Sequence, residues 1–244
     1  SNTQIPPVLV KQGGAVTGEV VDRLSDNGLL ISENPDFYYY AHWLSFYDED
    51  FNLVSDKQVY DQYQLPLPAG KYYVRTGNPF ERQTHRGYIN QVYPGIECNG
   101  QLCDLSQGQM ITVREGEYTE NINFELNRGH VISGSVIADG SNPAHPIARA
   151  RVEVYDEQKN FLMDVDTFTD GTYSIGGLKN GRYYLKTSNG KKYQQFHQLK
   201  EDAWGWLDVV YPEVPWPKNQ CDLSDGNLVE SNGQDVTGIR FELK

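Results

Sequence analysis

Two of the three cysteines lie close enough in the chain to form a disulfide. Cys98 and Cys103 flank residues 99–102, which begin with Asn-Gly, a dipeptide that favours tight turns. Such a turn brings the two thiols together, so the sequence predicts a Cys98–Cys103 disulfide; two free thiols are the alternative. A disulfide in turn indicates an oxidising compartment, whether extracellular, in the cell envelope or periplasmic. Cys221 lacks such a partner, because the residue five positions before it, where Cys98 stands relative to Cys103, is Trp216.

The residue types that most often bind metals or catalyse reactions do not occur at the spacings of known metal-binding or catalytic motifs. The five histidines form neither His-x-His nor His-Glu-x-x-His. Asp164, Asp166 and Asp170, like the acids at 48–50, do not follow the twelve-residue calcium loop, and we interpret them as exposed residues at strand edges. No Gly-x-Ser-x-Gly motif and no phosphate-binding glycine loop occurs. We therefore expect no metal, no cofactor and no catalytic residue, and no enzyme activity.

Two clusters of aromatic residues could bind a ligand. The first lies within residues 37–43 and would place aromatic rings on both faces of one strand, where a half-exposed strand normally carries polar groups on its outer face. The second crowds a loop of the second half. Aromatic faces stack on sugar rings and anchor protein partners. The candidate ligand-binding residues are Tyr38, Tyr40, Trp43, Trp204, Trp206, Tyr211 and Trp216. The alternative is that these rings are buried where one half of the chain packs on the other.

The overall charge limits the range of partners. The chain of 244 residues has a net charge of -12, which repels the phosphate backbone of nucleic acids, so we expect no nucleic-acid partner. A hydrophobic content of 38% is enough for a folded core, which excludes a disordered chain. No apolar stretch approaches eighteen residues, so we expect no membrane span.

The chain repeats itself, and this repeat predicts the architecture. Residues 72–76 (YYVRT) correspond to 183–187 (YYLKT), and each segment follows a glycine. Tyr-Pro precedes Cys-Asp-Leu by the same spacing in both halves, and Phe-Glu-Leu closes both. The offset between the copies stays between about 108 and 118 residues, which indicates two homologous units with small insertions.

Alternating apolar residues between glycine-containing turns indicate strands in both copies. A glycine inside the first strand of each copy, Gly18 or Gly134, marks a bulge or a close approach of another backbone. We expect no helix longer than two turns, and residues 198–206 are the best candidate for a short one. The predicted strands cover residues 15–21, 37–46, 58–65, 71–76, 110–114 and 119–126 in the first copy, and 131–137, 151–155, 161–169, 172–175, 182–187, 228–229 and 236–243 in the second.

Residues 170–185 (DGTYSIGGLKNGRYYL) resemble the signature of carboxypeptidase regulatory-like domains, which are related to collagen-binding-protein B-type repeats and to transthyretin-like sandwiches. Residues 134–152 resemble the opening of the same signature, with Arg149 in place of its glycine. The first copy keeps only the end of the signature, in residues 64–74. The resemblance implies two tandem Ig-like or prealbumin-like β-sandwiches of about seven strands each, in an all-β chain. It implies no catalytic residues.

These observations predict three segments: a lead-in at 1–14, a first sandwich at 15–127 and a second at 128–244. We expect a non-catalytic accessory module of a secreted or cell-surface protein, serving as a structural spacer or as an adhesion or interaction domain. Its partners would be neighbouring domains of a longer parent protein and a protein or polysaccharide ligand. The alternative is a carbohydrate-binding module that uses the tryptophans and tyrosines named above.

Overall fold

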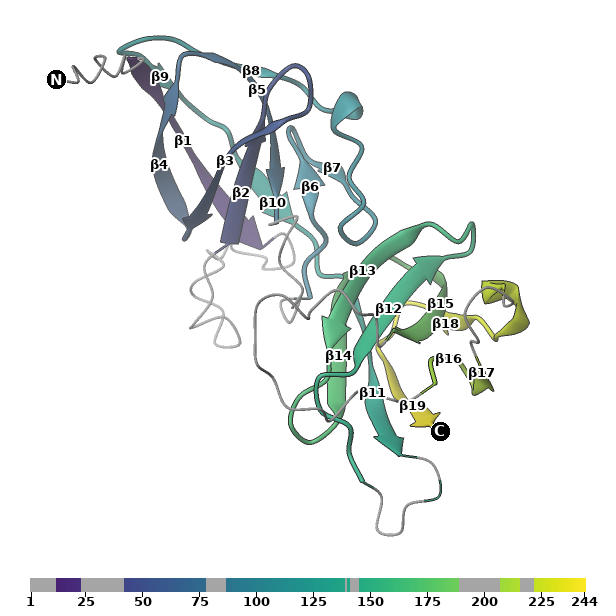
Figure 1. Cartoon of the computed structure of the whole chain (residues 1–244). Helices are drawn as coiled ribbons and strands as arrows, with labels where there is room; N and C mark the ends of the chain where they lie inside the picture. Colours follow the sequence, from purple (N-terminus) through teal and green to yellow (C-terminus); the bar gives the residue numbers. More distant parts are fainter. Residues whose placement is uncertain are drawn as a thin grey trace, which may run out of the picture. The chain divides into compact units, whose positions relative to one another are not determined.

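The computed structural model describes residues 12–22, 42–77, 87–138, 140, 145–188, 207–215 and 222–244. The described residues form β-strands with two short 3₁₀ helices and no α-helix, which confirms the predicted all-β class (Figure 1). The chain divides into two compact units. Unit 1 comprises Ser1–Asn78, Gln91–Ile96 and Asp104–Leu126, and unit 2 comprises Pro79–Asn90, Glu97–Cys103 and Asn127–Lys244. The domain limits read from the sequence, 15–127 and 128–244, stay a prediction.

Unit 1 is a sandwich of two sheets. The small sheet has the order β10-β1-β4, with β9 also paired to β1, and the large sheet has the order β3-β2-β5-β6-β7, with β8 paired to β5. The strands are β1 (Gly13–Asp22), β2 (His42–Tyr47), β3 (Leu53–Val59), β4 (Gln62–Pro68), β5 (Gly70–Thr76), β6 (Gln91–Val92), β7 (Ile96–Glu97), β8 (Ile111–Val113), β9 (Tyr118–Thr119) and β10 (Phe124–Leu126), with the 3₁₀ helix η3 (Leu105–Gln107).

Unit 2 repeats this arrangement. Its small sheet has the order β14-β11-β19, and its large sheet has the order β13-β12-β15-β16-β17, with β18 paired to β15. The strands are β11 (His130–Ala138), β12 (Arg151–Asp156), β13 (Phe161–Asp166), β14 (Thr172–Leu178), β15 (Gly181–Ser188), β16 (Val209–Val210), β17 (Val214–Pro215), β18 (Val229–Ser231) and β19 (Val236–Leu243), with the 3₁₀ helix η5 (Leu223–Asp225).

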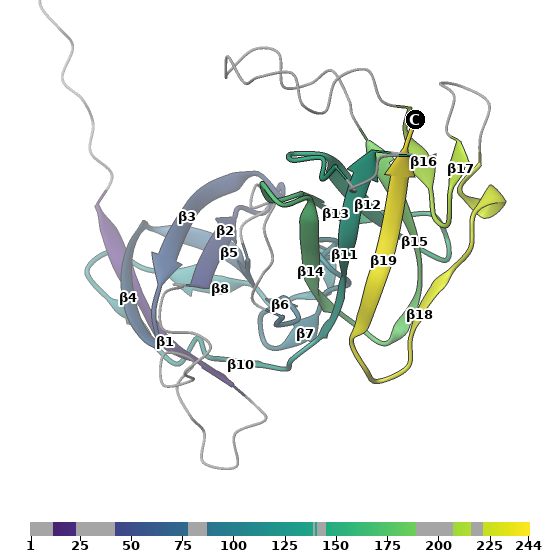
Figure 2. The same ribbon diagram turned by 90° about the horizontal axis from the view of Figure 1, so that it is seen from below.

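The pairing scheme is the same in both units, so the sequence repeat is also a structural repeat. In each unit the first strand pairs antiparallel with the fourth (β1 with β4, β11 with β14). Each first strand also pairs parallel with the last strand of its unit, β10 or β19. The strands β11 and β19 lie side by side in both views (Figure 1, Figure 2). A common ancestor for the two halves explains the shared connectivity.

Alternation of side chains builds the core of each unit. In β4 every second residue is buried and the residues between are exposed, as expected for a strand that covers a core on one face. In unit 2 the core brings both sheets together, with Val136 and Phe241 from the small sheet and Val152, Val154 and Leu185 from the large one. All five are inaccessible to solvent.

Two predicted strands of the first copy are wrong in extent. Residues 58–65 do not form one strand, because the chain leaves β3 at Val59 and enters β4 at Gln62, in the other sheet. Residues 119–126 are likewise split between β9 and β10. There Asn121 adopts a positive φ of 64°, a conformation that interrupts a strand. The predicted short helix at 198–206 lies outside the described residues, as does the predicted strand at 37–46 before β2 begins.

The two glycines of the first strands lie where another backbone comes close, as predicted. A Cβ atom on Gly18 would stand 2.1 Å from the carbonyl oxygen of Ile122, and one on Gly134 would stand 1.6 Å from that of Ile239. The pairing of β11 with β19 also shifts register between Ile132 and Gly134. Each glycine therefore leaves the space in which the last strand of its unit approaches the first.

Replacing Gly134 by alanine should destabilise unit 2 by about 3 kcal/mol, because the new methyl group collides with a backbone carbonyl that cannot rotate away. The measurement is the free energy of unfolding by urea, followed by circular dichroism. Ser135→Ala, one position along the same strand, is the control and should change stability little. Equal effects of the two substitutions would show that the close approach does not constrain the fold.

Candidate functional site

Five of the seven predicted ligand-binding aromatics lie outside the described residues. These five are Tyr38, Tyr40, Trp204, Trp206 and Trp216. The other two, Trp43 and Tyr211, belong to different units. The two aromatic clusters therefore stay a prediction, and the structure describes only these two of their residues.

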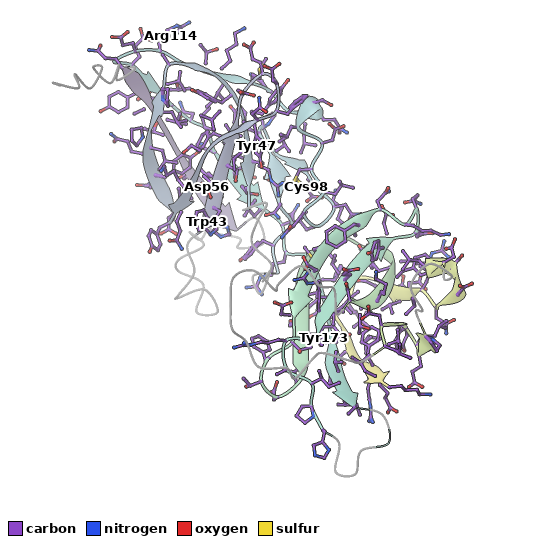
Figure 3. The ribbon with its side chains drawn as sticks, viewed as in Figure 1. Trp43, Tyr47, Asp56, Cys98, Arg114 and Tyr173 are labelled. Atoms are coloured by element: carbon purple, nitrogen blue, oxygen red, sulfur yellow. A yellow bond between two sulfur atoms is a disulfide. The ribbon has the colours of Figure 1, made fainter. Side chains whose placement is uncertain are left out.

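Trp43 lies on a strand face that is largely buried. It is the second residue of β2 (Figure 3), and it is half-buried. Ser45 and Tyr47 follow on the same face, and both are buried. Among the described residues that follow Trp43 on this face, none adds an exposed side chain on which a sugar ring could stack.

Tyr211 packs on the core of unit 2. Its ring meets Phe241 edge-on, with ring centroids 6.2 Å apart. The matching pair in unit 1, Tyr93 and Phe124, has the same arrangement, at 6.1 Å. Both tyrosines precede a cis proline. Their shared task is packing between the sheets, and these contacts lend no support to a sugar-binding role for Tyr211.

A paired row of charges covers the outer face of the large sheet of unit 2. Lys186 Nζ lies 2.9 Å from Glu153 Oε2, and the hydroxyl of Tyr155 donates a hydrogen bond of 2.6 Å to the same oxygen. Arg151 Nε lies 2.8 Å from a carboxylate oxygen of Asp164. Burial opposes ionisation of Glu153, yet hydrogen bonds from Lys186 and Tyr155 hold the pKa of its carboxyl below the usual value. Burial and the neighbouring Glu153 raise the pKa of Tyr155.

This row corrects the interpretation of the aspartates. Asp164 and Asp166 do lie on the edge strand β13, but they face Arg151 and are only partly exposed, at 17% and 36% of their side chains. Asp170 is exposed, and its carboxylate accepts hydrogen bonds from the backbone and the hydroxyl of Thr172 in the turn before β14. All three carboxylates therefore stabilise the fold through ion pairs or hydrogen bonds.

The corresponding face of unit 1 carries different residues at matching positions. Strand pairing places Ser45 beside Arg75 and Asp56, where unit 2 has Glu153 beside Lys186 and Asp164. Arg75 is only 5% exposed, and burial lowers the pKa of its guanidinium. Burial likewise raises the pKa of the neighbouring Tyr47. The positions of Tyr47 and Asp56 on this face can be followed in Figure 3.

The outer face of the small sheet of unit 1 contains a polar hollow of about 520 Å³. It lies over the paired strands β1 and β4 and the loop between β9 and β10. Its lining offers hydrogen-bonding amides and one carboxylate without a nucleophile–base pair. The lining residues are Thr17, Gly18, Glu19, Gln62, Tyr63, Gln64, Asn121 and Asn123.

Beneath this hollow a buried tyrosine ties three strands together, and unit 2 has the same device. Strand pairing places Tyr63 of β4 opposite Gly18. Its hydroxyl reaches across the glycine and donates a hydrogen bond to the carbonyl of Ile122, just before β10. In unit 2, Tyr173, labelled in Figure 3, lies opposite Gly134. Its hydroxyl donates to the carbonyl of Ile239 at 3.0 Å. We call each set of tyrosine, glycine and carbonyl a tyrosine lock.

Burial raises the pKa of both lock tyrosines, so their hydroxyls stay protonated as donors. The repeated sequence had indicated the glycines of the locks. It gave no signal for the carbonyl partners, because these lie on strands that are remote in sequence.

The glycine and tyrosine at the start of β5 and β15 form a second repeated device. The Tyr72 hydroxyl donates to the carbonyl of Pro68 at 2.9 Å, and the Tyr183 hydroxyl donates to that of Lys179. Each ring folds back over the glycine two residues earlier, where a Cβ atom would lie 3.0 to 3.2 Å from the hydroxyl. Burial raises the pKa of Tyr183 to about 12. This part of the motif closes a turn.

The disulfide between Cys98 and Cys103 is present and closes a small loop of unit 2. Gln101 within the loop donates its backbone N–H to the carbonyl of Leu162 on the edge strand β13. Lys179 Nζ donates to the carbonyl of Glu97 at 2.9 Å. The loop thus covers part of an edge strand that would otherwise be open to pairing.

Across the described residues, no group of three or more histidine, cysteine, aspartate or glutamate side chains could hold a metal ion. In the same part of the chain, no helix is long and apolar enough to cross a membrane.

No protein-family model matches the chain, and no curated protein matches it either. Some solved structures are similar. Shaft pilin SpaA of Lactobacillus rhamnosus GG (E269A mutant) is 8% identical, with 97% of this chain and 98% of that chain covered and a TM-score of 0.34. The minor pilin GBS52 of Streptococcus agalactiae is 14% identical, with 95% of each chain covered and a TM-score of 0.28.

The TIE protein of Bacillus anthracis is 13% identical, with a TM-score of 0.32. The match covers 96% of this chain but spans only about a third of that one, 34%. Likenesses this weak assign no function to the chain.

Removing the disulfide by Cys103→Ser should lower the free energy of unfolding by about 2 kcal/mol, since the short loop gains freedom in the unfolded chain. The amide proton of Gln101 should also lose protection against hydrogen exchange. Its acceptor is the carbonyl of Leu162 on β13, and a loop without the covalent link should separate from that strand more often. Both effects should reappear in the wild-type protein after chemical reduction. Unchanged protection at Gln101 would show that the loop docks without the covalent link.

Replacing Lys159 by methionine should raise the pKa of Asp222, which lies below its ordinary value first because Lys159 donates to the carboxylate and then because Ser224 does. The folded pKa is depressed, so the interaction stabilises the protein above the ordinary titration range of aspartate, and this contribution is lost as the pH falls through the folded pKa. Carboxyl NMR titration measures the shift. Asp104, the matching residue of unit 1, accepts from Ser106 and Gln107 instead and is the internal control. An unmoved Asp222 pKa would refute the assignment.

Proposed function

We propose that the chain is a non-catalytic accessory module of a secreted or cell-surface protein, serving as a structural spacer or as an adhesion or interaction domain. The observation that carries this proposal is the use of the repeated residues. Gly18 and Gly134 admit a neighbouring backbone, and Tyr63 and Tyr173 donate to buried carbonyls. Residues that recur in both units therefore maintain the scaffold, which is the expectation for a module without a reaction centre.

The assignment of each unit to the carboxypeptidase regulatory-like domains belongs to the same proposal. Its support is the physical role of the signature in unit 2. Gly171 of the Asp-Gly turn has a φ of 74°, and Tyr173 and Tyr183 donate to backbone carbonyls. A signature whose residues maintain turns and sheet contacts fits a family motif that is structural.

The Cys98–Cys103 disulfide supports an oxidising location. We place the chain outside the cell, in the cell envelope or in a periplasm. The partners proposed are neighbouring domains of a longer parent protein and a protein ligand. The net charge of -12 disfavours nucleic acids as partners.

The purified chain should show no turnover of ester, peptide or glycoside substrates above a heat-denatured control. A broad library of chromogenic and fluorogenic substrates provides the measurement. Variants at the most nearly catalytic constellation, Glu153→Gln and Tyr155→Phe, serve as probes of any activity detected. Turnover that one of these substitutions abolishes would overturn the proposal, because a scaffold has no residue on which a reaction depends.

A further inference from the structure

We propose that each unit is a tension-bearing clamp, in which the first and last strands carry a pulling force as one parallel ladder. The proposal deepens the spacer role. It rests on that role in one respect, because a spacer between other domains is where a pulling force would act on the chain. The clamp of unit 2 is the pair β11 and β19, and the clamp of unit 1 is β1 with β9 and β10.

Parallel pairing of the terminal strands decides how tension acts. The start of the first strand and the finish of the last strand lie at opposite ends of a parallel ladder. Tension applied through the chain therefore slides the two strands along each other, and the hydrogen bonds of the ladder must fail together. If the two strands were antiparallel, the same tension would peel them apart one bond at a time.

In unit 2 the ladder is long. Register runs from Ile132 opposite Val236 to Ala138 opposite Leu243, with one shift between Ile132 and Gly134. The strands lie side by side in both views (Figure 1, Figure 2). Phe241 and Leu243 face the core, so water has poor access to the bonds they flank.

In unit 1 the ladder is interrupted but bridged. Ala15 and Val16 of β1 pair with β9, and residues 20–22 pair with β10. Between these sections the Ile122 N–H donates to the carbonyl of Thr17 at 3.0 Å, and the Glu19 N–H donates to the side chain of Asn123 at 3.1 Å. Hydrogen bonds thus connect the strands along most of β1.

The tyrosine locks strengthen both clamps from the side. Each lock tyrosine comes from the strand on the opposite edge of the small sheet, β4 or β14, and bonds the far strand across a glycine. A sliding last strand would have to break this bond as well as its ladder. The repeated glycine admits the carbonyl, and the repeated tyrosine holds it.

The test pulls the same folded protein in two directions by optical tweezers or atomic force microscopy. Cys221→Ser is present throughout, so that a thiol handle attaches at one chosen site. In the first geometry, handles at the two chain ends load both ladders along their strands. In the second, handles at Thr169→Cys and at the C-terminus load unit 2 from one end of its ladder. Thr169 lies near that end because the carbonyl of Gly171 accepts a hydrogen bond from Val136, and Val136 pairs with Phe241 near the end of β19.

End-to-end pulling should give two unfolding steps, each releasing about 40 nm of chain. Unit 2 should yield at a severalfold higher force end to end than when pulled from Thr169. Equal forces in the two geometries would overturn the clamp. That result would leave the spacer role standing, whereas substrate turnover would reject the spacer role without affecting the forces.

A matched pair of substitutions tests the lock. Tyr173→Phe removes the hydroxyl that bonds Ile239, and Tyr183→Phe removes a hydroxyl that bonds Lys179 away from the clamp. Both keep the buried ring. Tyr173→Phe should lower the end-to-end unfolding force of unit 2 clearly more than Tyr183→Phe does, at comparable loss of equilibrium stability. Equal losses of force would remove the lock from the clamp.

Discussion

The structure depends on one interaction that occurs twice: a tyrosine hydroxyl bonded to a backbone carbonyl across a glycine. In unit 2 the three parts are Tyr173, Gly134 and Ile239, from the three strands of the small sheet. A buried carbonyl without a donor costs free energy, and a side chain on the glycine would exclude the carbonyl altogether. Each part therefore constrains the other two, and with them the order of the strands.

The two units keep this geometry while the outer faces of their large sheets differ. Glu153 and Lys186 form an ion pair in unit 2, whereas Ser45 and Arg75 occupy the matching positions in unit 1. Pairs on a sheet face can be exchanged because they need only satisfy each other. A lock residue must fit a strand from another part of the chain, so fewer residue types serve there.

This division bears on function. A scaffold whose recurrent residues close turns, admit carbonyls and seal the core leaves its outer faces for partners. The disulfide loop also has a structural role, since Gln101 covers the edge of β13 while the Cys98–Cys103 bond holds the loop closed. Accessory and spacer modules need such stable frames, and tension along the chain would act on the parallel ladders first.

The sequence by itself determined the features that depend on neighbours in the chain: the repeat, the all-β class, the Asn-Gly turn beside Cys98 and the special positions of Gly18 and Gly134. Tertiary structure alone decided which strands meet. It divided residues 58–65 between two sheets, paired the first and last strands in parallel, set Tyr211 against Phe241 and brought Asp164 to Arg151. The reason is physical: alternation reveals that one face of a strand is buried, but the partner that buries it is fixed by the packing of segments remote in sequence.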